Sequence, residues 1–270
     1  MPTVPSALHD RVIDILRSAA DEAVMPRFRR LREAEVIEKA KDELVTVADR
    51  DAEALITRRL LDAWPGSRVV GEEACAADPA VADDLDRGWV WLVDPLDGTA
   101  NFVAGEPTFA LMAALLCDGE AVGSWILDPV NGVSWRAELG AGAFRDSDRV
   151  YTTAAARAAN ELSGAVLTRF LPPDLRTSIE ARRTNVAACL PGMRCAGIEY
   201  PAIVRDTQQF ALFWRTLPWD HVPGALLLTE AGGRVARLDG SPYRASDGHK
   251  GLLAAGHPAA WETVREALLS

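Results

Sequence analysis

An almost unbroken apolar run, GWVWLV at residues 88–93, ends abruptly at Asp94. Its length and its lack of polar alternation are typical of a β-strand that is buried on both faces. In open α/β sheets, ligands bind in the crevice at the carboxyl ends of such strands. The run therefore predicts an interior strand of an α/β sheet, with Asp94 facing a ligand-binding crevice.

The rest of the chain contains both helical and strand patterns, which predicts a mixed α/β fold. Helices are expected at residues 6–35 (with a break near Pro26), 49–63, 174–185, 219–231 and 258–268. Strands are expected at 68–70, in an antiparallel meander at 109–117, 121–127 and 133–137, and at 164–167 and 251–255. A polar, Ala-rich stretch from Tyr151 to Asn160 marks the passage between two predicted lobes, residues 1–150 and 151–270.

The chain is acidic: 29 Lys and Arg residues against 39 Asp and Glu residues give a formal net charge of −10 over 270 residues. A negative field repels polyanions, and the densest basic stretch, Arg27 to Arg32, is followed at once by Glu33. Nucleic acid is therefore not expected as a partner. With 49% hydrophobic residues, the chain can bury a large core without a disulfide framework.

The same sequence favours the cytoplasm as the compartment. The four cysteines include no Cys-x-x-Cys pair, so we interpret them as free thiols in a reducing environment. Met1 to Asp10 lacks the basic start and the apolar stretch of a signal peptide. The longest apolar run, Phe109 to Cys117, is too short to span a bilayer. We therefore expect a cytoplasmic protein with no membrane segment.

The segment DPLDGT at residues 94–99 directly follows the buried run. Pro95 stiffens the turn, so that Asp97 can return toward the point that Asp94 faces. If a short helix begins here, the N–H groups of Gly98 and Thr99 form an anion site. Carboxylates beside an anion site suit a hard cation between them, and the lack of His and Cys favours Mg²⁺ over Zn²⁺. A simple tight turn, which Asp, Pro and Gly also favour, is the alternative.

Further acids stand at the ends of other predicted elements. Glu72, with Glu73 beside it, follows the short strand at 68–70, and a solvated loop is the alternative, more for Glu73 than for Glu72. Asp49 and Asp220 stand where helices begin, so each could instead be an N-cap. His221 is a possible general base, but a lone His at a helix start is more often structural or exposed.

The sequence lacks the motifs of several other enzyme classes. It contains no Gly-x-x-x-x-Gly-Lys-Ser/Thr loop, no Gly-x-Ser-x-Gly elbow and no His-Glu-x-x-His. Gly140-Ala141-Gly142 lacks the third glycine of a dinucleotide-binding fingerprint. These absences argue against nucleotide kinases, serine hydrolases and zinc proteases.

Taken together, four strings resemble the inositol monophosphatase family of magnesium-dependent, lithium-sensitive phosphatases. Leu44 to Asp49 resembles its Val-Thr-x-x-Asp element, Gly71-Glu72-Glu73 its Gly-Glu-Glu, and Trp91 to Phe102 (WLVDPLDGTANF) its signature. Trp219-Asp220 with Thr229 to Gly233 (TEAGG) resembles its C-terminal signature, and the order along the chain is the family's. The resemblance implies a layered αβαβα sandwich, a homodimer, and metals bound between the lobes.

The resemblance also implies ligands for two or three Mg²⁺ ions. The first ion would be held by Glu72, Asp94 and the carbonyl of Leu96. The second would be held by Asp94, Asp97 and Asp220, and Glu72 would help to hold a weaker third ion. Residues 1–150 would thus supply most metal ligands, while residues 151–270 would supply Asp220 and substrate contacts.

Catalytic and substrate-binding roles follow from the same resemblance. Thr99, oriented by Asp49, would position or deprotonate the attacking water, with Glu72 as a third catalytic residue. The N–H groups of Gly98 and Thr99 would hold the phosphate. Substrate contacts are expected from Asp97, Gly98, Thr99, Gly197, Ile198 and Asp220.

The residues expected on the alcohol side of the substrate depart from the family pattern. Family members that act on inositol phosphate have a Gly-Thr-Ala segment and a Glu there, whereas this chain has Ala196 to Tyr200 (AGIEY) and Phe213. A Phe cannot hydrogen-bond the hydroxyls of a polyol.

We expect a Mg²⁺-dependent phosphomonoesterase acting on a small phosphorylated metabolite, inositol 1-phosphate by family default. Histidinol phosphate, fructose 1,6-bisphosphate and 3′-phosphoadenosine 5′-phosphate stay open as substrates, and a non-catalytic regulatory or binding protein is the alternative from another class.

Overall fold

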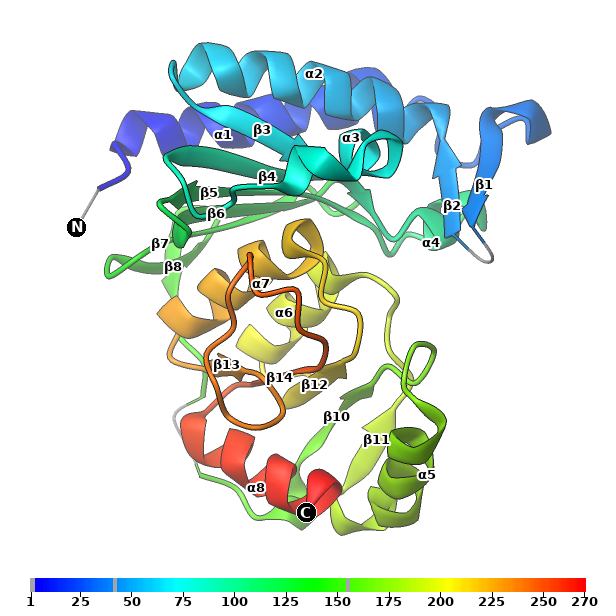
Figure 1. The fold of residues 1–270 in the computed structure, drawn as a ribbon, viewed down its shortest axis with the longest axis vertical. Helices are drawn as coiled ribbons and strands as arrows, with labels where there is room; N and C mark the ends of the chain where they lie inside the picture. Colours follow the sequence, from blue (N-terminus) through cyan, green and yellow to red (C-terminus); the bar gives the residue numbers. More distant parts are fainter. Residues whose placement is uncertain (1–2, 41–42, 154–155) are drawn as a thin grey trace.

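A computed structural model describes residues 3–40, 43–153 and 156–270. They form five layers, in the order helices, sheet, helices, sheet, helices, stacked along the long axis of the molecule (Figure 1). The predicted αβαβα sandwich is therefore confirmed. Residues 154 and 155 of the predicted passage between lobes, and the first two residues of the chain, lie outside the described residues.

The first layer contains α1 (Ser6–Ala19) and α2 (Val47–Ala63), which pack on one face of the first sheet. One π-helical turn, Ala20–Val24, extends α1, and only a short 3-10 turn, Glu33–Glu35, follows. The predicted break near Pro26 is therefore confirmed, but the predicted continuation of the helix to about Glu35 was wrong. Pro26 has no N–H to continue the helix, and Arg29 adopts a positive φ of 60°, which no helix accommodates.

The first sheet has seven strands, in the spatial order in which they occur in the chain. Strand β4, second in this order, pairs in parallel with the edge strand β3 and in antiparallel with β5, and the remaining pairs are antiparallel. The meander is thus confirmed, and β8 and β9 extend it beyond the prediction. The strands are β3 (Arg68–Gly71), β4 (Trp89–Asp97), β5 (Ala110–Cys117), β6 (Glu120–Asp128), β7 (Val133–Glu138), β8 (Gly142–Arg145) and β9 (Asp148–Val150).

Strand β4 is buried on both faces, as its sequence predicts. Trp91 and Val93 face the core beneath α1 and α2, whereas Val90 and Leu92 face a core on the opposite side. The strand continues past Asp94 to Asp97, with an irregular register between these two residues. Pro95, which cannot donate to a strand ladder, lies within that irregularity.

The middle layer consists of α6 (Ala196–Val204) and α7 (Pro218–Glu230), which lie between the two sheets (Figure 1). The two helices approach closely because Gly224 of α7 faces the ring of Tyr200. A Cβ at Gly224 would lie 2.0 Å from the Cδ2 atom of Tyr200. This packing brings the first turn of α7, with Asp220, to the carboxyl end of β4.

The second sheet and its outer helices complete the sandwich. Its strand order is β11, β10, β12, β14, β13, with β10 parallel to both β11 and β12. The helix predicted at 174–185 is α-helical only to Arg182, and a 3-10 turn continues it to Asn185. The elements are β10 (Ser163–Val166), β11 (Ala188–Leu190), β12 (Phe210–Phe213), β13 (Arg234–Ala236), β14 (Leu252–Ala255), α5 (Pro173–Arg182) and α8 (Pro258–Leu269).

Short elements at the edge of the first sheet approach the site. A hairpin of β1 (Val36–Ala40) and β2 (Glu43–Thr46) leads into α2, while α3 (Glu72–Ala77) and α4 (Thr99–Val103) follow β3 and β4. All four cysteines are free thiols, as expected. Within the described ranges, no helix is both long and apolar enough to cross a membrane.

Candidate active site

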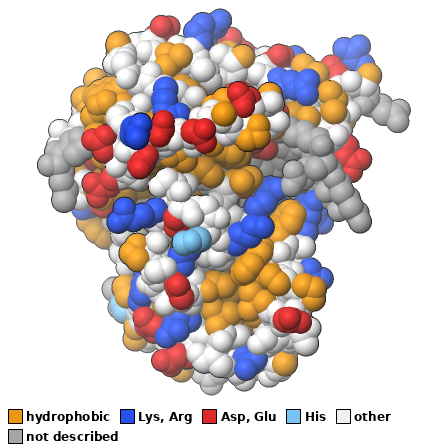
Figure 2. Space-filling view, viewed as in Figure 1, with side chains coloured by type: hydrophobic (Ala, Val, Ile, Leu, Met, Phe, Trp, Pro, Cys, Tyr) orange, Lys and Arg blue, Asp and Glu red, His pale blue; other side chains and the backbone are white. Residues whose placement is uncertain are grey.

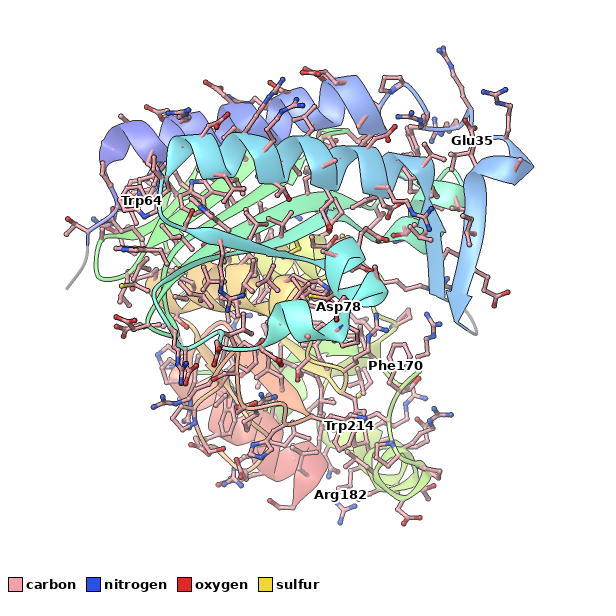
Figure 3. All side chains as sticks on the ribbon, turned by 45° about the horizontal axis from the view of Figure 1, so that its top comes forward. Glu35, Trp64, Asp78, Phe170, Arg182 and Trp214 are labelled. Carbon is pink, nitrogen blue, oxygen red and sulfur yellow. The ribbon has the colours of Figure 1, made fainter. Side chains whose placement is uncertain are left out.

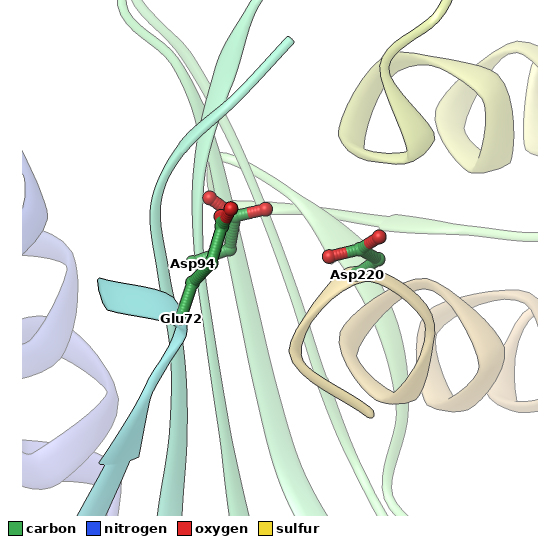
Figure 4. A group of neighbouring side chains, drawn as sticks. All are labelled: Glu72, Asp94 and Asp220. Carbon is green, nitrogen blue, oxygen red and sulfur yellow. The ribbon is translucent and has the colours of Figure 1, made fainter. Parts of the chain in front are cut away.

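Three carboxylates from distant parts of the sequence meet between the first sheet and the middle helices. Glu72 is the first residue of α3, Asp94 lies in β4, and Asp220 lies in the first turn of α7. One carboxylate oxygen from each lies within 4.8 Å of the other two. Figure 4 shows Glu72 and Asp94 close together, with Asp220 facing them from the end of its helix.

The electrostatics of this group favour a cation. The side chain of Asp94 is only 2% exposed. Burial raises its pKa well above the usual range, and the facing charges of Glu72, Asp97 and Asp220 raise the pKa further. A divalent cation bound among the carboxylates would offset this repulsion. Because the donors are all oxygens, the set fits Mg²⁺, which prefers carboxylates and water as ligands.

Asp97, also predicted as a ligand, is not one of the three carboxylates in this group. Its Oδ2 atom accepts a hydrogen bond of 2.6 Å from the N–H of Gly197, at the start of α6. Burial raises the pKa of Asp97 to about 6, and the bond from Gly197 opposes this rise. No local sequence pattern indicates this hydrogen bond, which fixes Asp97 between the first sheet and the middle helix layer.

The structure does not bring two of the predicted substrate contacts to the site. Gly197 is buried, and a Cβ on it would lie 2.6 Å from the Cβ of Ala110. Two cavities, of about 130 and 320 Å³, lie at the carboxylates, and neither Gly197 nor Ile198 lines them. Gly197 instead acts on the site indirectly, through its N–H group on Asp97.

Buried Asp49 and half-buried Thr99 form a hydrogen-bonded pair. Thr46, not Asp49, is the N-cap of α2, so the alternative that made Asp49 the N-cap was wrong. Asp49 Oδ2 accepts the N–H and the hydroxyl of Thr46 at 2.7 and 2.6 Å. Its Oδ1 atom is thereby directed at the Thr99 hydroxyl, 3.0 Å away. Burial raises the pKa of Asp49 to about 7, although the bonds from Thr46 lower it.

Gly98 is required at the turn between β4 and α4. Its φ of +91° is a left-handed conformation that side chains rarely adopt, and a Cβ would lie 2.9 Å from the carbonyl oxygen of Thr108. The carbonyl oxygen of Leu96, a predicted metal ligand, also lies 3.0 Å from the Thr99 hydroxyl. The backbone thus brings Leu96, Gly98 and Thr99 to one wall of a small cavity.

That cavity has a volume of about 130 Å³, and its lining includes the carboxylates, residues 96–99 and three arginines. No local motif contains Arg169, Arg194 or Arg215, so the sequence did not indicate them as site residues. A topological signal existed for two of them: Arg169 follows β10 and Arg215 follows β12, and these strands are parallel neighbours. The carboxyl ends of parallel strands meet at one edge of a sheet, where ligands bind.

A larger cavity of about 320 Å³ adjoins the first, and Asp97, Asp220 and the three arginines line both. Phe213, which stands about where family members have a Glu, lines this cavity and is 3% exposed. Its ring stacks on Tyr200 at a centroid distance of 5.4 Å. Phe170 and Trp214 also line the cavity and are labelled in the lower half of Figure 3.

His221 is structural. Burial lowers its pKa to about 3, so the ring is neutral. Tyr200 Oη lies 3.1 Å from Nδ1, and Nε2 lies 3.0 Å from the carbonyl oxygen of Arg215. Since a carbonyl can only accept, Nε2 carries the proton and the Tyr200 hydroxyl donates to Nδ1. Both ring nitrogens are occupied, which leaves His221 no free nitrogen for general base catalysis.

Comparisons with known proteins agree with this arrangement. The sequence model of the inositol monophosphatase family matches residues 9–269. An inositol-1-monophosphatase of Caulobacter vibrioides is 29% identical over 265 residues, which cover 95% of this chain and 100% of the relative. A Pseudomonas aeruginosa protein named Nus factor SuhB is 32% identical over 249 residues, covering 87% of this chain and 88% of the relative.

A solved structure gives the same result for the fold. The crystal structure of extragenic suppressor protein suhB from Bartonella henselae superposes with a TM-score of 0.84 at 25% sequence identity. The superposition covers 98% of this chain and 99% of that one. The chain therefore belongs to the inositol monophosphatase family and is a phosphoric monoester hydrolase.

Proposed function

We propose that this enzyme hydrolyses a small phosphate monoester with Mg²⁺ held by Glu72, Asp94, Asp220, one oxygen of Asp97 and the carbonyl of Leu96. The observation that carries the proposal is the group of three carboxylates within 4.8 Å of one another, beside the Thr99–Asp49 pair. When bound, Mg²⁺ supplies positive charge that makes water more acidic and offsets the charge on the transferring phosphoryl group.

The residues of the chain then act by binding and orientation. The Thr99 hydroxyl has one proton, which it donates to Asp49 Oδ1 or to the Leu96 carbonyl, each 3.0 Å away. Its lone pairs are then available to accept a hydrogen bond from the attacking water. Gly98 and Thr99 line the cavity of about 130 Å³, which receives the phosphate, and the adjoining cavity receives the alcohol part.

Inositol 1-phosphate is the family's default substrate, and it is a poor match for the alcohol side of this site. Phe213 offers no hydrogen bond to a hydroxyl, and Gly197 and Ile198 do not line the cavity. We expect low kcat/KM for inositol 1-phosphate relative to the true substrate. Inhibition by Li⁺, two or three Mg²⁺ ions per site, a homodimer and a cytoplasmic location stay predictions.

A panel of phosphate esters tests the proposal. Phosphate release is measured with and without Mg²⁺ for inositol 1-phosphate, histidinol phosphate, fructose 1,6-bisphosphate and 3′-phosphoadenosine 5′-phosphate. Asp97→Asn is the active-site variant, and Asp62→Asn, which changes an exposed carboxylate on α2, is the matched control. Mg²⁺-dependent release that is lost only in Asp97→Asn supports the proposal. Release without Mg²⁺, or an undiminished rate in Asp97→Asn, contradicts it.

A regulatory role is the second candidate, because the Pseudomonas aeruginosa relative is named a Nus factor. A purely regulatory protein would not need a complete set of metal ligands. This chain has every carboxylate of the ligand set that the family resemblance implies. Calorimetric titration separates the two functions. Binding of Mg²⁺ without turnover of any ester in the panel would favour the regulatory role.

A further inference from the structure

Three arginines distinguish the substrate side of the site. Arg169, Arg194 and Arg215 come from three separate segments, after β10, before α6 and after β12. All three line both the small cavity and the adjoining cavity of about 320 Å³. In the larger cavity they outnumber the two carboxylates, Asp97 and Asp220, although the chain carries a net charge of −10. On the face shown in Figure 2, basic side chains lie next to an apolar patch at the waist of the molecule.

Two of these guanidinium groups are held against one aromatic ring. The Cζ atoms of Arg169 and Arg215 lie 4.7 and 4.8 Å from the ring centroid of Phe170, which is 39% exposed. Cation–π contacts of this kind hold the two planar groups over the face of the ring. A planar, pre-oriented guanidinium suits bidentate binding of phosphate or carboxylate.

The backbone beside Arg215 is anchored by a buried polar group. The neutral ring of His221, 3% exposed, donates to the Arg215 carbonyl oxygen, and Tyr200 in turn holds the opposite ring nitrogen. This chain of bonds ties Arg215 to both α6 and α7. Arg215 is therefore presented from a fixed position.

Arg194 is held in a similar way. Its φ of 56° is a left-handed conformation that is uncommon for a residue with a side chain. The preceding residue, Met193, is fixed on both sides: its carbonyl oxygen accepts a 2.8 Å bond from Asn101, and its N–H donates to the fully buried Glu199. The surrounding structure thus keeps Arg194 in a strained conformation, which is common at ligand sites.

The rest of the larger cavity offers little to a hydroxyl-rich alcohol. Phe170, Phe213 and Trp214 provide aromatic surface. Asp97 and Asp220 line this cavity on the side of the proposed metal site. Apart from these two, no carboxylate or carboxamide side chain among the described residues lines it. The lining combines arginine hydrogen-bond donors with apolar surface. This combination suits an alcohol part that contains a ring or another apolar group and carries a negative charge.

We propose that Arg169, Arg194 and Arg215 form a second anion subsite, and that the substrate is a phosphate monoester with a second anionic group, phosphate or carboxylate, on its alcohol part. The inference rests on the proposed function, because the scissile phosphate must lie at the carboxylates while the second anion lies in the larger cavity. The enzyme then discriminates among phosphate esters by the charge of the leaving alcohol.

A matched series of aryl phosphates tests the subsite. Phenyl phosphate has no second charged group, and its 3- and 4-carbamoyl derivatives serve as controls with a neutral ring substituent. The 3- and 4-carboxy derivatives carry a carboxylate as the second anion. The benzene bisphosphates carry a second phosphate. We expect kcat/KM for at least one charged probe to exceed that for its neutral control by about tenfold or more, since a hydrogen bond to a charged group contributes about 1.5–3 kcal/mol. The carboxylate and bisphosphate arms identify which anion is preferred.

The variants Arg169→Gln, Arg194→Gln and Arg215→Gln are compared with Arg205→Gln, which changes an exposed cation at the end of α6. The readout is the ratio of kcat/KM for the charged probe to that for its neutral control. We expect this ratio to fall about tenfold in the three variants and to stay unchanged in Arg205→Gln. An equal loss on charged and neutral probes would show that the arginines serve only the scissile phosphate, and would overturn the proposal. A ratio near one in the wild type would also overturn it.

Turnover of phenyl phosphate reports the proposed function separately. If no probe is hydrolysed, that function fails, and calorimetric binding of the carboxyphenyl phosphates still tests the subsite. We then expect the dissociation constant to rise about tenfold in the three arginine variants and not in Arg205→Gln. Equal affinity in all variants would contradict the subsite.

Discussion

The hydroxyl of Thr99 lies 3.0 Å from Oδ1 of Asp49, and it links two residues that are 50 positions apart. Asp49 is itself fixed by two hydrogen bonds from Thr46, so the pair places an oriented hydroxyl beside the carboxylate group. Asp49 is buried, at 1% exposure, whereas Thr99 is half-buried and lines the small cavity. The orientation of the Thr99 oxygen is thus determined by the start of α2.

The first prediction concerns this hydroxyl. Thr99→Ala removes the oxygen that accepts from the attacking water, so kcat should fall by about a hundredfold or more, in the range of a positioned acid–base group. Thr99→Ser keeps the oxygen and should retain most of the rate. Initial-rate kinetics at saturating Mg²⁺ measure the effect, and equal melting temperatures show that both variants fold. Equal rates in Thr99→Ala and the wild type would exclude this role.

The second prediction concerns Glu53, which positions Glu72. The Glu53 carboxylate, 7% exposed, accepts the N–H groups of Glu73 and Ala74 at 2.8 Å each, and so caps the helix that begins at Glu72. Glu53→Gln replaces one acceptor with a donor and should disturb that turn. The Mg²⁺ concentration for half-maximal activation should rise about tenfold, as for other groups that orient metal ligands.

The matched control for Glu53 lies on the same helix. Asp51 is exposed on α2 and pairs with Arg27 on the protein surface. Asp51→Asn should leave the Mg²⁺ activation curve unchanged. If Glu53→Gln and Asp51→Asn give the same curve as the wild type, Glu53 does not position Glu72.

The third prediction is a pH dependence of stability that arises from His9. Burial lowers the pKa of His9 below 6.5, although Glu138 opposes the shift and the charges of Arg136 and Asp10 also act on it. Nε2 lies 3.2 Å from Glu138 Oε2, and the buried Nδ1 has no partner among the described residues. Protonation would therefore bury a second N–H group without an acceptor.

The sign follows from proton linkage. Below pH 6.5 the unfolded chain binds a proton at His9 that the folded chain resists, so the free energy of unfolding falls as the pH falls. The limiting slope from one such group is about 1.4 kcal/mol per pH unit. Urea unfolding at pH 7.5 and 5.5 should show a smaller loss of stability in His9→Gln than in the wild type. The same loss in both proteins would argue against a lowered pKa.

The fourth prediction concerns Phe213, which packs in the cavity wall. Its ring stacks on Tyr200 and meets the ring of His221 edge-on at 4.7 Å. Phe213→Ala should reduce the free energy of unfolding by about 3–5 kcal/mol, the usual cost of emptying a buried aromatic site. Phe213→Leu should cost less because it fills more of the space. A loss under about 1 kcal/mol in Phe213→Ala, measured by urea unfolding, would show that the site collapses or tolerates the vacancy.

Much of the layered fold could be predicted because its signals are local. The run before Asp94 has the apolar continuity of a two-sided strand, and both faces of β4 are indeed buried. The meander was predictable from the turns Asp118-Gly119 and Asn131-Gly132, where glycines adopt positive φ. Pro26 likewise indicated the break in the first helix, whereas the positive φ of Arg29, after which no α-helix resumes before Glu35, had no local signal.

The candidate site could be predicted only where its residues belong to strand ends and helix starts. Glu72, Asp94 and Asp220 were predicted together, and the structure gathers them. The bond from Gly197 to Asp97 spans 100 positions and depends on how α6 packs against the first sheet, which no local pattern encodes. The arginines of the larger cavity escaped prediction for the same reason.

The central claim is that phosphate ester hydrolysis requires a cation held by Glu72, Asp94 and Asp220. The most direct test strips the enzyme with EDTA and measures phosphate release from its best substrate while Mg²⁺ is restored stepwise. The wild type should be inactive without metal and recover with Mg²⁺. Asp220→Asn should stay at least about a hundredfold below the wild type, because the lost charge stabilisation amounts to several kcal/mol, and Asp62→Asn should recover fully. Full activity of the stripped wild type, or normal recovery of Asp220→Asn, would contradict the account.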